Sequence, residues 1–250
     1  MNWWGKLIGS GIGLLGGPMG ALVGAAIGHL YDEDDITPQD EKKARILYIA
    51  YFFSCASKIA KADGRISAKE ISVTESIMDR MGLNKKTKEF AKNVFRKAKH
   101  SRRSIDEEFR EVGKLIGFDE VVGQSFLGGL FEIVISNGTK LNNIQFKYLQ
   151  RAEMCLQLPN GLVRSWVNGG YAPPSYKIDR NSMSLNEAYN ILGLKTNSSD
   201  SEIKTAYRKR AANFHPDKLK SKNLPDEFIS FANDQLAKVN QAYERIKKEG

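Results

Sequence analysis

Apolar side chains recur at helical spacing through the middle of the chain, from residue 40 to about residue 158. Five stretches have apolar positions three and four residues apart, as in a helix that buries one face: residues 68–81, 86–99, 105–116, 120–136 and 142–156. The preceding run, ARILYIAYFFSCASKIAKA, is apolar on nearly every side. It predicts the central buried helix, with a second membrane span as the alternative. No sustained alternation of apolar and polar residues indicates strands, so the expected fold class is all-α.

The C-terminal part, residues 185–250, has the pattern of three helices. A short first helix ends near Gly193, and a second covers residues 200–213 after a capping box that opens at Ser199. The third covers residues 226–247. The second and third are long and similarly amphipathic, so they are expected to pair as an antiparallel helical hairpin. Residues 159–184, before them, are rich in glycine, proline and other turn formers and are predicted to be a linker.

The N-terminal residues 1–31 follow a third pattern. The 22 residues between Lys6 and His29 carry no charged side chain. As a helix they would extend about 33 Å, which matches a bilayer core. Glycines four residues apart let two membrane helices approach closely. The candidates for such a dimer interface are Gly5, Gly9, Gly13, Gly16, Gly20, Gly24 and Gly28. A membrane anchor is favoured over a cleaved signal peptide and over a soluble glycine-rich linker.

Residues 7–28 of this anchor either span the bilayer straight or bend at Pro18 into a re-entrant segment. Lys42, Lys43 and Arg45 follow the anchor. Because basic residues gather on the cytoplasmic side of a membrane, the C-terminal bulk is expected in the cytoplasm. The predicted organisation is an anchor at 1–31, a helical domain at 40–158, a linker at 159–184 and a C-terminal domain at 185–250.

The formal net charge is +9, and most of the excess lies in one stretch. Residues 85–103 contain nine lysines and arginines against the single acid Glu89. Such a concentration predicts one basic face. The stretch is either a solvated helix with Phe90, Val94 and Phe95 turned inward, or a surface that lies on anionic lipid headgroups. Nucleic acid ranks below both as a partner, because no base-reading module accompanies the charge.

The two cysteines, Cys55 and Cys155, both lie in apolar helical contexts, and the sequence contains no CxxC pair. Together with three scattered histidines they do not have the spacing of a zinc site. They are expected to be buried free thiols in a reducing compartment.

The loop KADGRISAKE, residues 61–70, offers a structural and a chemical interpretation. In the structural one, Ser67 caps the next helix and Glu70 completes a capping box. In the chemical one, Asp63 and Glu70 are candidate ligands of a hard cation, although the acidic positions of an EF-hand are missing. A degraded second copy at residues 137–141 has Gln145 where the acid would stand. No bound metal or cofactor is therefore expected.

The tripeptide His215-Pro216-Asp217 follows the basic second helix of the C-terminal domain. Proline cannot continue a helix and biases the preceding residue away from helical geometry. The tripeptide is therefore a forced turn that displays an imidazole beside a carboxylate. On the helix before it, Ile203 and Tyr207 are expected to face inward. The basic residues Lys204, Arg208, Lys209 and Arg210 are expected to face outward.

Four elements in residues 185–250 give these observations a context: YNILGL, the helix through YRKRA, the HPD turn and VNQAYERI. In order and spacing they resemble the J domain of the DnaJ family. That resemblance implies a non-enzymatic co-chaperone, which binds a DnaK-type chaperone and stimulates its ATPase. The residues that it implies for this contact are His215, Pro216, Asp217, Lys204, Tyr207, Arg208 and Lys209.

The resemblance extends over the rest of the chain. The N-terminal WGK, the segment running into IGHLYD and the ADGRIS…E loop look like the membrane-anchored DnaJ-like proteins of the DjlA type, whose middle domain is TerB-like. This likeness implies a protein of the bacterial inner membrane that responds to stress, contacts membrane lipid and forms homodimers. The sequence has no Gly/Phe-rich stretch and no CxxCxGxG repeat, so the client-binding apparatus of larger DnaJ proteins is not expected.

Two other functions compete with the co-chaperone. One is a stress- or metal-responsive membrane scaffold that acts through the TerB-like domain. The other is a hydrolase built on His215 and Asp217, but no serine or cysteine nucleophile is tied to them by a motif.

Overall fold

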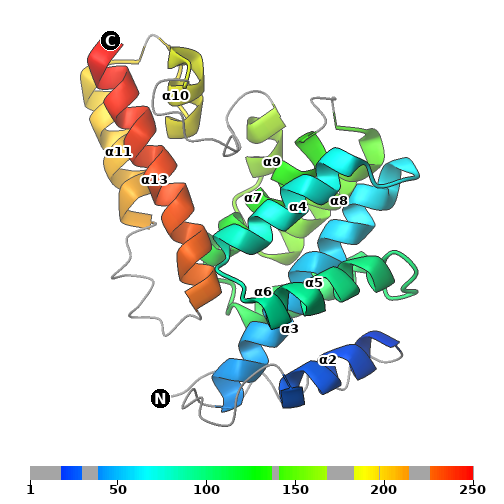
Figure 1. Ribbon diagram of the computed structural model, residues 1–250. Coiled ribbons are helices and arrows are strands. Elements are labelled where there is room, and N and C mark those ends of the chain that lie inside the picture. The colour runs from blue at the N-terminus through cyan, green and yellow to red at the C-terminus, as the bar shows by residue number, and fades with distance from the viewer. Residues whose placement is uncertain are drawn as a thin grey trace. The chain divides into compact units, whose positions relative to one another are not determined.

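The computed structural model describes residues 18–29, 39–136, 141–167, 183–196, 198–213 and 226–249. Within these ranges every element of regular secondary structure is a helix, which confirms the all-α prediction (Figure 1). The chain divides into two compact units, Met1–Leu158 and Pro159–Gly250, each described here by itself.

Unit 1 is a helical bundle. Its helices are α2 (Pro18–His29), α3 (Gln39–Ala60), the short 3₁₀ helix η1 (Lys61–Asp63), α4 (Ala68–Arg80), α5 (Lys85–Ala98), α6 (Ile105–Leu115), α7 (Glu120–Ile135) and α8 (Asn143–Cys155). The bounds of α4 to α8 lie within one residue of the predicted stretches. Side-chain caps explain this agreement, because Ser67, Asn84, Ser104, Asp119 and Asn142 each accept a hydrogen bond from a backbone N–H in the first turn.

Helix α3 is the central element of unit 1, as predicted. It packs against α5, α6, α7 and α8, and its aromatic residues are fully buried. The rings of Phe52 and Phe126 meet edge to face, with centroids 5.4 Å apart. The bundle therefore buries the apolar run that the sequence left open as a second membrane span. No helix in the described ranges has the length and apolar character needed to cross a bilayer.

Helix α2 is the described part of the N-terminal segment. It packs on α3 and α5 (Figure 1). Among its described side chains, those of Val23 and Ala26 are buried. Gly24 is exposed, and a β-carbon added there would meet nothing within 4 Å. Of the other predicted interface glycines, Gly20 and Gly28 lie in α2, and Gly5, Gly9, Gly13 and Gly16 fall outside the described residues.

The thiol prediction is half correct. Cys55 is a free thiol with no exposed surface, in the C-terminal half of α3. Cys155 is also free but only half-buried, because it lies at the last residue of α8, where the helix reaches the edge of the bundle.

Unit 2 contains α9 (Leu162–Ser165), α10 (Leu185–Leu192), α11 (Asp200–Asn213) and α13 (Asp226–Glu249). Helix α9 lies in the predicted linker, and the buried residues Val163 and Trp166 give this part of the linker more structure than expected. The Pro173-Pro174 pair lies outside the described residues. Helices α10, α11 and α13 match the three predicted C-terminal helices.

Candidate functional site

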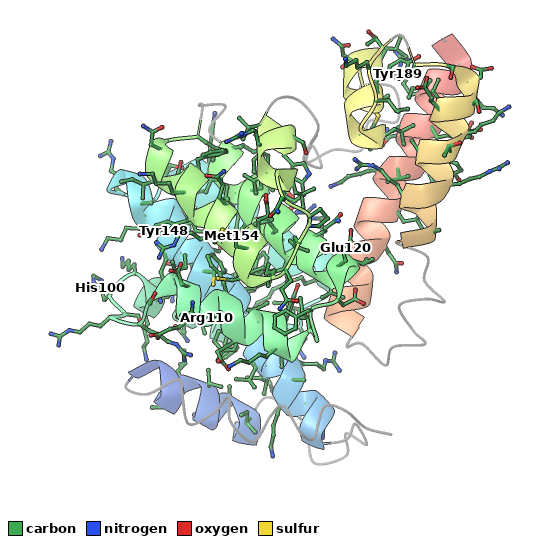
Figure 2. All side chains as sticks on the ribbon, turned by 180° about the vertical axis from the view of Figure 1, so that it is seen from behind. His100, Arg110, Glu120, Tyr148, Met154 and Tyr189 are labelled. Atoms are coloured by element: carbon green, nitrogen blue, oxygen red, sulfur yellow. The ribbon has the colours of Figure 1, made fainter. Side chains whose placement is uncertain are left out.

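The candidate site stands on a small three-helix core in unit 2. Helix α13 packs against both α10 and α11, and α10 also contacts α11. Tyr189, labelled in Figure 2, is one of the buried residues of α10. The others described in this core are Ala188, Ile191, Leu192, Ile203, Val239, Ala242 and Ile246. These apolar contacts fix the direction in which α11 presents its other face.

The start of α11 is fixed by the predicted capping box. The backbone N–H of Ser199 donates to Glu202 Oε2 at 2.7 Å, and the Ser199 hydroxyl donates to the same oxygen at 2.8 Å. In return, the Glu202 backbone N–H donates to Ser199 Oγ at 3.4 Å. These bonds to Ser199 hold the pKa of the Glu202 carboxyl below its ordinary value.

The exposed face of α11 is basic. Lys204 and Arg208 are both exposed and lie four residues apart, so they occupy adjacent turns of one face. Ile203 is buried on the other face, in agreement with the prediction. Lys209 lies in the same helix, but its side chain is outside the described part of the structure.

Tyr207 connects α11 to α13. Its ring stacks on Tyr243, with centroids 4.1 Å apart and planes 14° apart, and its hydroxyl donates to Asn240 Oδ1 at 3.3 Å. The Lys247 ammonium lies 5.7 Å from the Tyr243 ring centroid, within cation–π range. The main role of Tyr207 is therefore to position α11 against α13, rather than to offer its ring to a binding partner. The prediction of inward Tyr207 is correct, and its partners on α13 were not foreseen.

Arg210 does not face outward as predicted. A β-carbon added to Gly193 would lie 2.7 Å from a guanidinium nitrogen of Arg210, so the side chain packs against the end of α10. Gly193 has φ +73°, a geometry that favours glycine. Burial lowers the pKa of Arg210. The outward basic face is therefore narrower than the sequence pattern indicated.

The turn itself, His215-Pro216-Asp217, lies outside the described residues, which resume at Asp226. In the sequence it begins two residues after Asn213, the last residue of α11. It thus belongs to the connection between the two helices of the hairpin.

Comparison with known proteins decides the family. A profile described as the co-chaperone DjlA transmembrane domain matches residues 1–46, and the DnaJ domain profile matches residues 187–249. The chain is 29% identical over 265 residues to co-chaperone protein DjlA of Coxiella burnetii, covering 99% of this chain and 98% of that protein. It is a DnaJ-like protein of the DjlA type.

Other relatives extend this result. Over 272 residues the chain is 28% identical to co-chaperone protein DjlA of Escherichia coli K12, covering 100% of this chain and 98% of the relative. The protein with that name from Legionella pneumophila is 28% identical over 280 residues, with 98% and 95% covered. No solved structure matches the chain.

The DjlA-type assignment indicates which class of partner the C-terminal site binds. A J domain implies an Hsp70- or DnaK-type partner, so this chain is a co-chaperone that regulates another protein rather than a conventional enzyme. The transmembrane-domain match and the relatives indicate a membrane-anchored protein. The two profiles cover the two ends of the chain, and the TerB-like assignment of the middle stays a prediction.

The loop of the DjlA-type middle domain has a capping role. The Ser67 backbone N–H donates to Glu70 Oε2 at 2.8 Å, and the Glu70 N–H donates to Ser67 Oγ at 3.1 Å. The degraded copy keeps the same geometry, because the Asn142 N–H donates to Gln145 Oε1 at 3.3 Å. An amide can therefore replace the acid without loss of the cap. Among the described side chains, which exclude that of Asp63, no cluster suited to a metal ion occurs.

One cluster in unit 1 was missed in the sequence. Glu108 of α6 is buried and accepts hydrogen bonds from Ser54 and Lys58 of α3. The sequence did contain one indication of this cluster: Glu108 directly precedes Phe109 and lies on the buried side of an amphipathic helix. The partner helix cannot be read from that position alone.

Proposed function

We propose that this DjlA-type protein binds a DnaK-type chaperone through its J domain and stimulates the ATPase of that chaperone. One observation carries the proposal. In a chain that matches the DnaJ domain, the exposed basic face of α11 runs towards an HPD tripeptide that begins two residues after the helix ends.

The residues of the proposed contact divide by role. Lys204 and Arg208 are exposed cations that steer the J domain onto an acidic surface of the partner and raise the association rate. Lys209 adds to this charge. His215, Pro216 and Asp217 form the rigid polar contact itself, and a preorganised contact of this kind loses most of its effect when one side chain is changed.

Tyr207 acts indirectly in this proposal. Its stack on Tyr243 keeps α11 and α13 aligned, so the basic face and the turn are presented together. We therefore assign Tyr207 a positioning role within the chaperone-binding set.

The test is single-turnover ATP hydrolysis by a purified bacterial DnaK, with the full chain added in a neutral detergent. The wild-type protein should accelerate hydrolysis, and His215→Gln should abolish the acceleration while leaving the helical content unchanged. His100→Gln is the matched control, because His100 is an exposed histidine of unit 1 (Figure 2). Failure of the wild type to stimulate, or equal stimulation by His215→Gln, would refute the proposal.

We further propose that the anchor, residues 1–31, holds the TerB-like domain (40–158) and the J domain (185–250) at the cytoplasmic face of the bacterial inner membrane. The glycines four residues apart support self-association of the anchor as a homodimer. Gly9→Leu with Gly13→Leu should weaken the dimer in detergent, as measured by analytical ultracentrifugation. Protease should digest the J domain in inverted vesicles but not in intact spheroplasts, and the reverse pattern would exclude this topology.

A further inference from the structure

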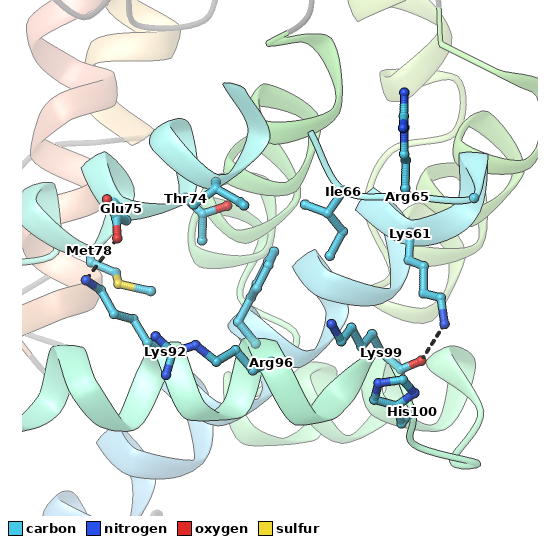
Figure 3. A pocket seen from close by; sticks show the side chains of 13 residues that line it. Lys61, Arg65, Ile66, Thr74, Glu75, Met78, Lys92, Arg96, Lys99 and His100 are labelled. Atoms are coloured by element: carbon cyan, nitrogen blue, oxygen red, sulfur yellow. Dashed lines mark hydrogen bonds and ion pairs between the residues drawn. The ribbon is translucent and has the colours of Figure 1, made fainter. Parts of the chain in front are cut away.

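A cleft in unit 1 has no place in the chaperone mechanism. It lies between α5 on one side and η1, the loop after it and α4 on the other, and has a volume of about 500 Å³ (Figure 3). Two ion pairs, Lys88–Asp79 and Lys92–Glu75, join α5 to α4. The volume lies in the range of sites for small molecules rather than long peptides.

The cleft is strongly cationic. Five fixed cations line it, namely Lys61, Arg65, Lys92, Arg96 and Lys99, together with His100. Glu75 is the one described carboxylate among the lining residues, and it pairs with Lys92 at 2.9 Å. Arg96 donates to the neutral amide of Asn93 at 3.4 Å. Within the described residues, Arg65, Arg96 and Lys99 form no ion pair, so an anionic ligand would supply the missing counter-charge.

The cleft also has an apolar wall. Ile66, Ile71, Met78 and Phe95 line it between the cations. Ile71 is 46% exposed, although its side chain is large and aliphatic. An apolar surface surrounded by cations favours a ligand that carries both an anionic group and hydrocarbon, over a simple ion.

The position of the cleft narrows the choice of ligand. The chain is membrane-anchored, and α2, which lies within the transmembrane-domain match, packs on α5, the helix that forms one wall. Membrane lipid is thus within reach of the cleft. The surface of a bilayer with anionic lipids attracts clustered lysines and arginines, at about 1 kcal/mol for each cation near the surface.

We propose that this cleft binds the headgroup of an anionic phospholipid, with the phosphate on Arg96 and Lys99 and the first part of the acyl chains on Ile71 and Phe95. The site would dock the TerB-like domain on the membrane surface. This role is independent of the J domain and of chaperone binding.

Native mass spectrometry of the full chain in neutral detergent tests this. Dioleoyl-phosphatidylglycerol should bind at least tenfold more tightly than dioleoyl-phosphatidylcholine. Arg96→Gln with Lys99→Gln should weaken phosphatidylglycerol binding about 30-fold, from two cations at the magnitude above. The control Arg102→Gln with Lys147→Gln removes the same charge from exposed cations outside the cleft and should change binding less than threefold.

Further arms separate the possible ligands. Ile71→Ser should weaken phosphatidylglycerol binding several-fold but leave competition by inorganic phosphate unchanged, because phosphate has no hydrocarbon. Equal binding of the two lipids, or an equal loss in the control pair, would overturn the proposal. In competition, soluble dihexanoyl-phosphatidylglycerol should displace the lipid at the lowest concentration. If inorganic phosphate did so at a lower concentration, the ligand would be a free anion, and the proposal would fail. If a poly-glutamate peptide did so, the ligand would be an acidic protein, and the proposal would fail as well.

Discussion

Replacing Glu108 with glutamine should destabilise unit 1 by about 2 kcal/mol. Glu108 is 1% exposed. Its carboxylate accepts from Ser54 Oγ at 3.0 and 2.8 Å and from Lys58 Nζ at 2.6 Å, and Cys55 Sγ lies 3.5 Å away. These contacts join α3 to α6. The substitution therefore tests whether this buried polar cluster stabilises the bundle.

The magnitude follows from what glutamine keeps. An amide oxygen can still accept from Ser54, but the negative charge opposite Lys58 is lost. The Lys58 side chain is only 11% exposed, and separating a buried ion pair of this kind costs about 3–5 kcal/mol when one partner is removed. Lys58 retains a hydrogen bond to the Arg103 carbonyl oxygen at 2.9 Å, which limits the loss. Glu108→Ala, which removes every bond, should cost about 4 kcal/mol.

Alkylation of Cys55 in increasing urea, followed by peptide mass spectrometry, measures this free energy of unfolding. Cys55 has no exposed surface, so iodoacetamide reaches it only when unit 1 opens. Burial also raises the pKa of this thiol, which further suppresses reaction in the folded state. The readout is specific to unit 1, whereas circular dichroism would mix it with unit 2.

Glu107→Gln is the matched control, because Glu107 is the neighbouring residue, its side chain is 55% exposed, and it lies 3.7 Å from Arg103 Nε. A pair at 3.7 Å whose acidic partner is exposed should change the free energy of unfolding by less than about 1 kcal/mol. Lys58→Met combined with Glu108→Gln should recover part of the loss, since no unpaired cation remains. If Glu108→Gln unfolds at the wild-type urea concentration, or if Glu107→Gln costs as much, the buried pair does not stabilise the bundle.

Three further predictions concern α11, α13 and the thiols. Lys204→Ala with Arg208→Ala should raise the concentration for half-maximal DnaK stimulation about tenfold at low salt, and an unchanged value would exclude steering by this face. Tyr207→Ala should destabilise the J domain by about 2–3 kcal/mol in thermal unfolding, whereas Tyr207→Phe should stay within about 1 kcal/mol; equal losses would refute the importance of the stack. Burial raises the pKa of Cys155, so its thiolate fraction at pH 8 is lower when folded than when unfolded. Iodoacetamide should therefore modify it more slowly in the folded chain, with a rate that rises between pH 8 and 10, and a pH-independent rate would contradict this.

The parts of the fold that were predictable depend on local interactions. Ser67, Asn142 and Ser199 cap their helices through residues two or three positions away, so the sequence contains both partners and the helix starts follow. The J domain was predictable for the same reason, because its motifs are contiguous. Interactions between distant segments were not. Glu108 meets Lys58 across fifty residues, and nothing in the pattern of α6 names that partner.

Arg210 shows that helical periodicity does not always predict where a side chain lies, even within one helix. Periodicity placed it with Lys204 and Arg208 on the outer face, but a long side chain can reach beyond its own position. The bare backbone at Gly193 gives its guanidinium a surface to pack on. The choice depends on the packing of α10 against α11, which a helical pattern does not contain.

The excess positive charge of the chain therefore falls on two different kinds of surface. On α11, the exposed residues one helical turn from Lys204 and Arg208 are Asp200, Ser201, Thr205 and Ala212, which are all small. A face of this kind attracts an acidic partner from a distance but offers little apolar area to retain it, so its effect is on association and is screened by salt. In the cleft of unit 1, the cations surround Ile71 and Phe95. Burial of hydrocarbon there does not depend on ionic strength, so a bound amphiphile should persist at salt concentrations that abolish steering by α11.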